Sequence, residues 1–273
     1  MIESNLFTKS LHLMDIDFLI NSVIIEYDLS KANINILLYY KAISEDLYCE
    51  LYNADRMTRQ ITIGNMMKDP NISQIISNGF VEARRLFFDA NSIQDQDVLG
   101  IKKDAIYLLR KANFTKFDNL EFKEKNFYTS FYNIRSQRKE MYYCKDPITG
   151  EEKLDIKGIN DDSLIYHKDY FMEFLLVLFE TAQVDICAAI DILNTFTGKY
   201  LSRQLDLGYY RNFDSESAYT LHSNMSSIFG YKAMNLVTQD LGVLDINYNA
   251  TILRELFKIY SKQYFSTNRK PRC

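Results

Sequence analysis

Two aspartates, Asp28 and Asp104, stand where two predicted strands meet turns. Residues 23–27 are rich in β-branched and aromatic side chains, and Asp28 follows them directly. Asp104 closes the short turn Lys102-Lys103-Asp104 of a predicted β-hairpin. Phosphoryl transfer by two metal ions needs carboxylates that hold two cations about 4 Å apart, and positive groups on the phosphates. If the two strands are neighbours, Asp28 and Asp104 meet the first requirement, and Mg²⁺ is the metal expected.

Strands and helices alternate around these two residues, which predicts an α+β fold. Ser30 is expected to cap the first helix after Asp28. Four helices, over about 31–42, 44–53, 54–68 and 72–90, separate Asp28 from the hairpin of residues 97–101 and 105–109. Further strands are predicted near 120–123, 127–134, 140–144 and 153–158. From about residue 163 the pattern is helical, with an apolar stretch over 166–193 and helices near 216–225, 228–239 and 249–264.

Composition describes an ordinary globular chain of 273 residues, with 47% hydrophobic and 25% charged residues. The net charge of −4 argues against a protein that simply coats nucleic acid, although local basic clusters remain. The four cysteines have no zinc-ligand spacing, and no secretion signal or run of about 18 apolar residues occurs. We therefore expect a cytoplasmic protein with no membrane contact. The 20 Tyr and 18 Phe with no Trp, together with many Asn, Lys and Ile, suggest an AT-rich genome, that of a phage or a low-GC bacterium, and a phage origin is favoured.

Three segments, in order, resemble motifs A, B and C of the family A DNA polymerases, the DNA polymerase I type. They are DLSKANINIL (28–37), RMTRQITIGNMM (56–67) and LGIKKDA (99–105). In the family, motif A is an Asp followed by a small polar residue and a Glu. Motif B is a fingers helix with a Lys, an aromatic residue, a Gly and a Tyr, and the tip of motif C reads His-Asp-Glu. The resemblance covers about residues 20–112, roughly a third of the chain.

The resemblance implies roles for particular residues. Asp28 and Asp104 match the catalytic metal ligands, which would hold Mg²⁺. The nucleotide-binding positions matched on or near the fingers are Arg59, for the Lys that touches the incoming triphosphate, together with Asn33, Arg56 and Gly64. Contact with the phosphates of DNA or RNA is expected from Lys102 and Lys103.

The chain also departs from the family pattern. Asn33 replaces the motif A Glu that discriminates against ribose, and Ala105 replaces the motif C Glu. Ile63 and Met67 replace the aromatic residue and the Tyr of the fingers helix, so stacking on a base pair would be weaker. Since only about 27 residues precede motif A, the family's thumb and exonuclease domains are expected to be missing.

The resulting expectation is a polymerase palm-like antiparallel sheet with inserted fingers-like helices over residues 1–162. A helical domain over 163–273 follows, as a thumb substitute or an interaction module. The favoured function is a divergent, polymerase-derived protein of phage replication or transcription, a nucleic-acid-binding or assembly subunit with catalysis reduced or lost. Partners would be DNA or RNA and other subunits of such a complex. The alternatives are an active minimal nucleotidyltransferase using Asp28 and Asp104, and an α+β interaction protein with no nucleotide role.

Overall fold

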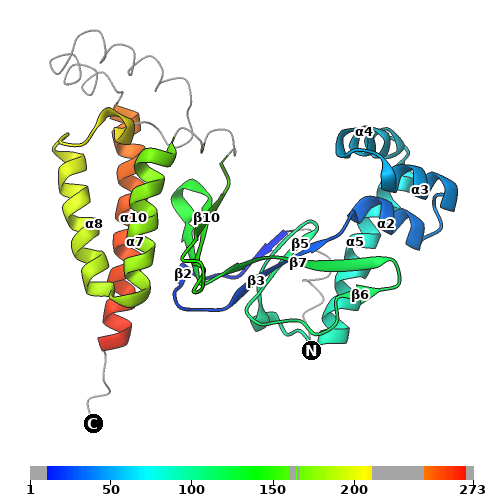
Figure 1. Cartoon of the computed structure of the whole chain (residues 1–273), viewed down its shortest axis with the longest axis horizontal. Coiled ribbons are helices and arrows are strands. Elements are labelled where there is room, and N and C mark those ends of the chain that lie inside the picture. Colours follow the sequence, from blue (N-terminus) through cyan, green and yellow to red (C-terminus); the bar gives the residue numbers. More distant parts are fainter. Residues whose placement is uncertain (1–10, 160–163, 165–166, 211–242, 269–273) are drawn as a thin grey trace, which may run out of the picture. The chain divides into compact units, whose positions relative to one another are not determined.

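The computed structural model describes residues 11–159, 164, 167–210 and 243–268. Antiparallel sheets and helices make it an α+β protein, with helices dominating the later part of the chain, as predicted (Figure 1). Contacts divide the chain into a first unit, Met1–Asp15 with Val23–Phe127, and a second unit, Ile16–Ser22 with Tyr128–Cys273. This grouping differs from the expected ranges 1–162 and 163–273, because the strands after residue 128 pack on the helices that follow them.

The first unit contains a six-stranded sheet in the order β1-β4-β5-β3-β7-β6. The pairs β1–β4, β4–β5, β5–β3 and β6–β7 are antiparallel. The Ser30 N–H donates to the Glu121 carbonyl at 2.8 Å, where β3 lies beside β7. The strands are β1 (Leu11–Leu13), β3 (Ile24–Leu29), β4 (Val98–Lys102), β5 (Ala105–Leu108), β6 (Lys116–Phe117) and β7 (Leu120–Tyr128).

One face of this sheet is covered by a helix, and the other carries polar side chains. Successive residues of a strand point to opposite faces. Ile25, Tyr27 and Leu29 therefore pack with α5 residues such as Phe87, while Glu26 and Asp28 point to the opposite face. The helices of the unit are α2 (Ala32–Tyr39), α3 (Glu45–Asn53), α4 (Arg56–Met66) and α5 (Pro70–Asn91), with the 3₁₀ turn η1 (Asp95–Asp97).

Local capping explains where these helices begin. Ser44, Asp55 and Asp69 are N-caps whose side chains accept backbone N–H groups of the first turns of α3, α4 and α5. Pro70 follows at the first position of α5, where a missing N–H costs nothing. The expectation that Ser30 caps α2 is wrong. Lys31 is the N-cap, with φ at 42° and no side-chain cap, because the chain turns sharply away from β3 there.

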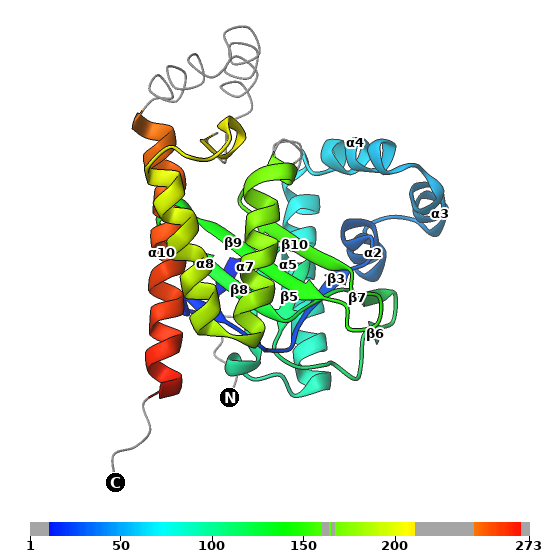
Figure 2. The same ribbon diagram turned by 60° about the vertical axis from the view of Figure 1, so that its left-hand side comes forward.

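The helices α2, α3 and α4 form a small second core with the start of α5. Ile34 and Leu37 from α2 pack with Leu51 from α3 and Ile63 from α4. Each of these four side chains is at most 5% exposed. Figures 1 and 2 show α3 and α4 near the same end of α5 as α2. Residues at the start of α4 and at the end of β3 line one cavity.

The second unit contains a four-stranded antiparallel sheet in the order β10-β9-β8-β2, packed on helices. Tyr132 of β8 stacks on Phe179 with ring centroids 4.2 Å apart, and Tyr260 meets Tyr132 edge-on. Its strands are β2 (Phe18–Leu19), β8 (Ser130–Ile134), β9 (Lys139–Lys145) and β10 (Glu152–Lys157). Its helices are η4 (Lys168–Met172), α7 (Glu173–Val184), α8 (Ile186–Leu201) and α10 (Val243–Asn268), with the turns η2 (Arg135–Gln137) and η5 (Leu207–Tyr210).

Two sequence predictions for this part of the chain need correction. The strand expected over 127–134 is broken at Thr129, and β7 instead runs unbroken from Leu120 to Tyr128. The helical stretch over 166–193 is broken at Asp185, whose extended backbone and capping carboxylate start α8. The helix expected over 249–264 lies within α10. The helices expected over 216–225 and 228–239 lie outside the described residues.

No helix among the described residues combines the length and apolarity needed to cross a bilayer.

Candidate functional site

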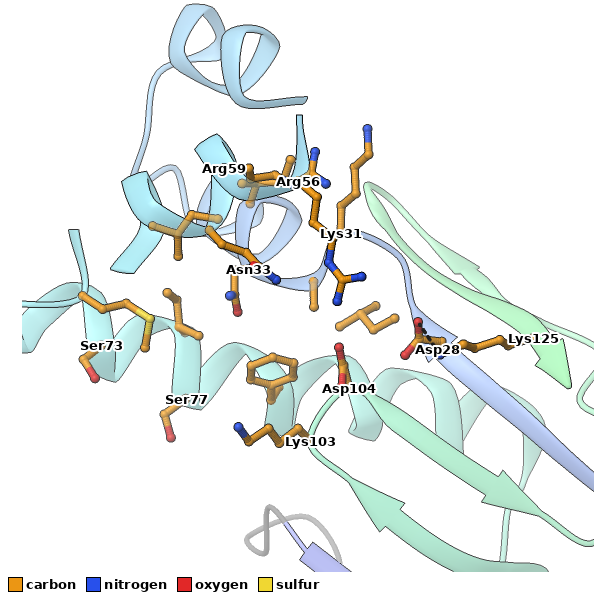
Figure 3. Close-up of a pocket in the computed structure, with 18 residues that line it drawn as sticks. Asp28, Lys31, Asn33, Arg56, Arg59, Ser73, Ser77, Lys103, Asp104 and Lys125 are labelled. Carbon is orange, nitrogen blue, oxygen red and sulfur yellow. Dashed lines mark ion pairs between the residues drawn. The ribbon is translucent and has the colours of Figure 1, made fainter. Parts of the chain in front are cut away.

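A cavity of about 810 Å³ opens in the first unit where β3, the β4–β5 turn and α4 converge (Figure 3). That volume is within the range of small-molecule sites. Its charged lining consists of two carboxylates and five cations: Asp28, Asp104, Lys31, Arg56, Arg59, Lys103 and Lys125. The neutral lining includes Asn33, Ser73 and Ser77. Because the chain as a whole has a net charge of −4, this excess of cations is a local feature that favours an anionic ligand.

Asp28 and Asp104 are brought together by the pairing of β3 with β5. Asp28 lies opposite Ala105 in this pair, and the Leu29 N–H donates to the Asp104 carbonyl at 2.9 Å. Figure 3 shows both carboxylates facing the cavity. Partial burial raises the pKa of the Asp28 carboxyl; Lys125 opposes this rise, while the negative charges of Asp104 and Glu26 add to it. The two carboxylates therefore repel each other across a shared space, which a bound cation would relieve.

A third carboxylate, Glu26, lies two residues before Asp28 on the same face of β3 and shares Lys125 with it. Glu26 is 2% exposed, and it accepts hydrogen bonds from the Tyr107 hydroxyl at 3.1 Å and from the Asn126 amide at 2.5 Å. The Lys125 ammonium lies 3.8 Å from a Glu26 oxygen and 3.8 Å from an Asp28 oxygen. Lys125 is thus held between two carboxylates and supplies the positive charge nearest Asp28.

The remaining cations differ in how firmly they are held. Lys31 donates to the Tyr52 carbonyl at 2.8 Å and lies over the Tyr52 ring. The Arg59 guanidinium donates to the Ala54 carbonyl at 3.2 Å. Arg56 and Lys103 have no ion-pair or hydrogen-bond partner for their side chains within the described part of the chain. These two are the side chains with most freedom to meet an incoming anion.

The residues named from sequence divide into two groups. Asn33, Arg56, Arg59 and Lys103 line the cavity together with the aspartates. Gly64 does not line it, and a Cβ atom built there would meet nothing within 4 Å. Lys102 also lies outside it, with its ammonium 5.9 Å from the centre of the Tyr107 ring.

Sequence reasoning missed Lys31, Lys125 and Glu26. Lys31 is adjacent to the motif A serine, so its position near the site was visible in the sequence. Lys125 belongs to β7, and its place depends on the pairing of β7 with β3 across about 100 residues of chain. No local pattern signals such a pairing. Glu26 reads as an ordinary polar residue of a half-buried strand, and only the contacts of its buried carboxylate show its role.

The turn that carries Asp104 is strained and is held by α5. Lys103 has φ at 53°, a left-handed conformation that costs a residue with a Cβ roughly 1–2 kcal/mol. Arg84 of α5 is 2% exposed, and its guanidinium donates to the Lys103 carbonyl at 3.2 Å. Burial lowers the pKa of Arg84. Arg84 therefore acts as a positioning residue for the turn, whereas its neighbour Arg85 pairs with Glu82 and Asp89 at the surface.

We expect Arg84→Met to destabilise the protein by about 1–3 kcal/mol, because it removes a hydrogen bond that a buried guanidinium donates to the Lys103 carbonyl. Arg85→Met is the matched control, since it removes an exposed arginine one residue away and should cost less than about 1 kcal/mol. Urea unfolding followed by circular dichroism measures both. An equal fall in the free energy of unfolding in the two variants would show that Arg84 does not support the turn.

The donor set fits a hard divalent cation. Magnesium prefers one or two carboxylates, with the remaining positions filled by water or phosphate oxygen. Asp28 and Asp104 supply two carboxylates that face the same space. Among the described residues no group of three or more His, Cys, Asp or Glu side chains is arranged to hold a metal. Any metal at this site would thus share its coordination with its ligand or with water.

These features define an α+β protein with paired carboxylates beneath a group of cations. The chain belongs to the family of the bacteriophage PBS1 gene 130 protein, whose family model matches residues 1–260. The phage origin expected from composition is thereby supported. A comparison with curated proteins finds none that matches the chain. The family description states no activity, so the function has to be argued from the site.

Proposed function

We propose that the cavity of the first unit binds a nucleoside triphosphate with Mg²⁺ and transfers its nucleotidyl group to the terminal hydroxyl of a nucleic-acid strand. The hydroxyl oxygen bonds to the α-phosphorus, its proton passes to solvent, and pyrophosphate leaves. The observation that carries this proposal is the meeting of Asp28 and Asp104 in one cavity with five cations. Phosphoryl transfer requires carboxylates that bind the metal and cationic side chains that contact the phosphates. A purely structural ion-pair network would balance its charges, whereas this one has an excess of positive charge.

Each side chain has a distinct part in this proposal. Asp28 and Asp104 would hold Mg²⁺, which when bound neutralises phosphate charge and favours attack at phosphorus. Arg56 and Arg59 approach from α4, and Lys103 from the β4–β5 turn, to contact phosphate oxygens. Asn33 offers an amide for a sugar or base hydrogen bond.

The order of elements also supports the proposal. A strand that ends in Asp28, a set of inserted helices and a hairpin that presents Asp104 follow the order of a polymerase palm and fingers. The resemblance to family A DNA polymerases rests on this order and on the motif residues within it. The departures lie at Ile63, on α4, and at Met67, the C-cap of α4, so base stacking is where this site would differ most from that family.

The test is incorporation of labelled dNTPs and NTPs onto primer–template and single-stranded primers, with Mg²⁺ or Mn²⁺ and the full chain. Arg56→Gln should raise KM for the triphosphate about tenfold or more, because a charge-assisted hydrogen bond contributes about 1.5–3 kcal/mol. Lys68→Gln is the control, since Lys68 is also an exposed cation but lies outside the cavity. Absence of incorporation with folded protein and both metals would exclude the proposed activity.

Lys125 gives a second, independent prediction. Because its ammonium competes with a metal for Asp28, Lys125→Gln should tighten Mn²⁺ binding about two- to fivefold, the range of a surface ion pair. Lys123→Gln, on the same strand but paired with Glu121, should leave the affinity unchanged. Titration calorimetry measures both. Unchanged or weaker binding in the Lys125 variant would place the metal away from Asp28.

A second candidate is a nucleic-acid-binding or assembly subunit without catalysis. The ion pair of Lys125 with Asp28 favours it, because a carboxylate already neutralised by a lysine has less need of a metal. This reading predicts nucleic-acid binding that is insensitive to divalent metal and to the loss of both aspartates. The incorporation assay and the metal titration together separate the two candidates.

A further inference from the structure

The exposed face of α10 in the second unit combines cations with aromatic rings. Arg254, Lys258 and Lys262 follow one another at four-residue spacing and are exposed. Phe257 and Phe265 lie on the exposed side as well, 40% and 62% exposed. The opposite side of the helix fills the core of the unit with Ile252, Leu253, Leu256, Ile259 and Tyr260. We call the surface formed by Arg254, Phe257, Lys258, Lys262 and Phe265 the α10 face.

The charges of the α10 face are mostly uncompensated. Arg254 and Lys258 have no ion-pair partner within the described part of the chain. Lys262 pairs with Asp17, which also pairs with Arg135 of the turn after β8. Glu255 is the acidic residue beside the face and is partly buried. The face therefore keeps positive charge available to a ligand.

Two hollows flank the α10 face. One, of about 250 Å³, lies between α8 and α10, where Asn194 and Thr197 meet Arg254 and Phe257. The other, of about 160 Å³, is lined by Asn133, by the cations Arg135, Lys258 and Lys262, and by the carboxylates Asp17 and Glu255. Each hollow places an amide beside a cation. Figures 1 and 2 both show α8 and α10 side by side, consistent with the first hollow.

We propose that the α10 face binds a single strand of nucleic acid, with phosphates on Arg254, Lys258 and Lys262 and bases stacked on Phe257 and Phe265. Cations that track a backbone and exposed rings that accept base faces are the two parts of sequence-independent single-strand binding. An acidic peptide would satisfy the cations but would leave the rings without a stacking partner. This inference goes beyond the cavity of the first unit and does not depend on that cavity being active.

The test is fluorescence anisotropy of labelled 20-residue oligothymidylate and oligouridylate with the full chain at increasing salt. The double variant Phe257→Ala with Phe265→Ala should bind at least about 25-fold more weakly, because two bases lose their stacking rings. The double variant Arg254→Gln with Lys258→Gln should also lower the salt slope by about 1.4, or 0.7 for each lost phosphate contact.

A matched control removes two exposed cations of the same unit outside both hollows, as Lys199→Gln with Arg203→Gln. Binding equal to the wild type in this control, with loss in the α10 variants, supports the inference. Binding that survives both α10 double variants, or that falls equally in the control, overturns it. The substituted α10 residues do not line the cavity of the first unit, which keeps this test separate from the proposed activity.

Discussion

Asp28→Asn and Asp104→Asn should each reduce metal-dependent nucleotide incorporation by about 100-fold or more. Metal ions stabilise the charge of phosphoryl transfer by several kcal/mol, and each 1.36 kcal/mol is a factor of ten in rate. Asn keeps the size of the side chain and removes only the charge that holds the cation. Steady-state incorporation assays at saturating Mg²⁺ measure the effect.

The same two variants should not lower thermal stability. The ionised Asp28 is disfavoured by partial burial and by the charges of Asp104 and Glu26, so removing one charge relieves repulsion. Thermal unfolding by calorimetry, without added metal, compares the variants with the wild type. A loss of activity together with a large fall in Tm would mean that the aspartates serve the fold, and the proposed role would fail.

Phe87→Ala should destabilise the protein by about 3–5 kcal/mol, the cost typical of removing a buried aromatic side chain. Phe87 is fully buried and contacts four aromatic rings, those of Tyr27, Phe88, Phe117 and Phe122. The ring of Phe122 is the nearest, with centroids 4.5 Å apart. Because Phe87 joins α5 to β3 and β7, its loss would loosen the strand that ends in Asp28.

Phe114→Ala is the matched control for that change, because the Phe114 side chain is 61% exposed in the same unit. It should shift the free energy of unfolding by less than about 0.5 kcal/mol, as surface substitutions usually do. Urea unfolding of both variants measures the difference. A small effect at Phe87 would contradict its place at the centre of the first unit's core.

Local features of this protein were predictable from sequence. Asp28 follows a short β-rich run and was correctly assigned to the end of a strand. The turn at Lys103 and Asp104 separates two apolar runs, so Asp104 was correctly assigned to the tip of a hairpin. The amphipathic pattern of residues 72–90 likewise predicts α5. The helix begins earlier than expected, because Asp69 is its N-cap and Pro70 its first residue, where a turn was predicted. Such signals depend on residues close in the chain, and the structure confirms the elements they predict.

Features that depend on distant pairing were not predictable. Lys125 reaches Asp28 because β7 lies beside β3, and no periodicity near residue 125 reveals that neighbour. Arg84 and Arg85 are adjacent in the sequence, and no local pattern indicates that Arg84 is the buried one, with its guanidinium on the Lys103 carbonyl. The break at Asp185 was missed because the apolar residues on both sides of it resemble one continuous helix. Asp is a favoured N-cap residue, and its carboxylate starts α8 here.

The measurement that tests the central claim most directly is anomalous X-ray diffraction from crystals of the full chain grown with Mn²⁺ and a non-hydrolysable nucleoside triphosphate. We predict an anomalous peak coordinated by Asp28 and Asp104, with the triphosphate reaching Arg56, Arg59 and Lys103. A crystal of the double aspartate variant should lack that peak. Manganese bound elsewhere, or a triphosphate that avoids the α4 cations, would contradict the proposal that this cavity is a nucleotidyl-transfer site.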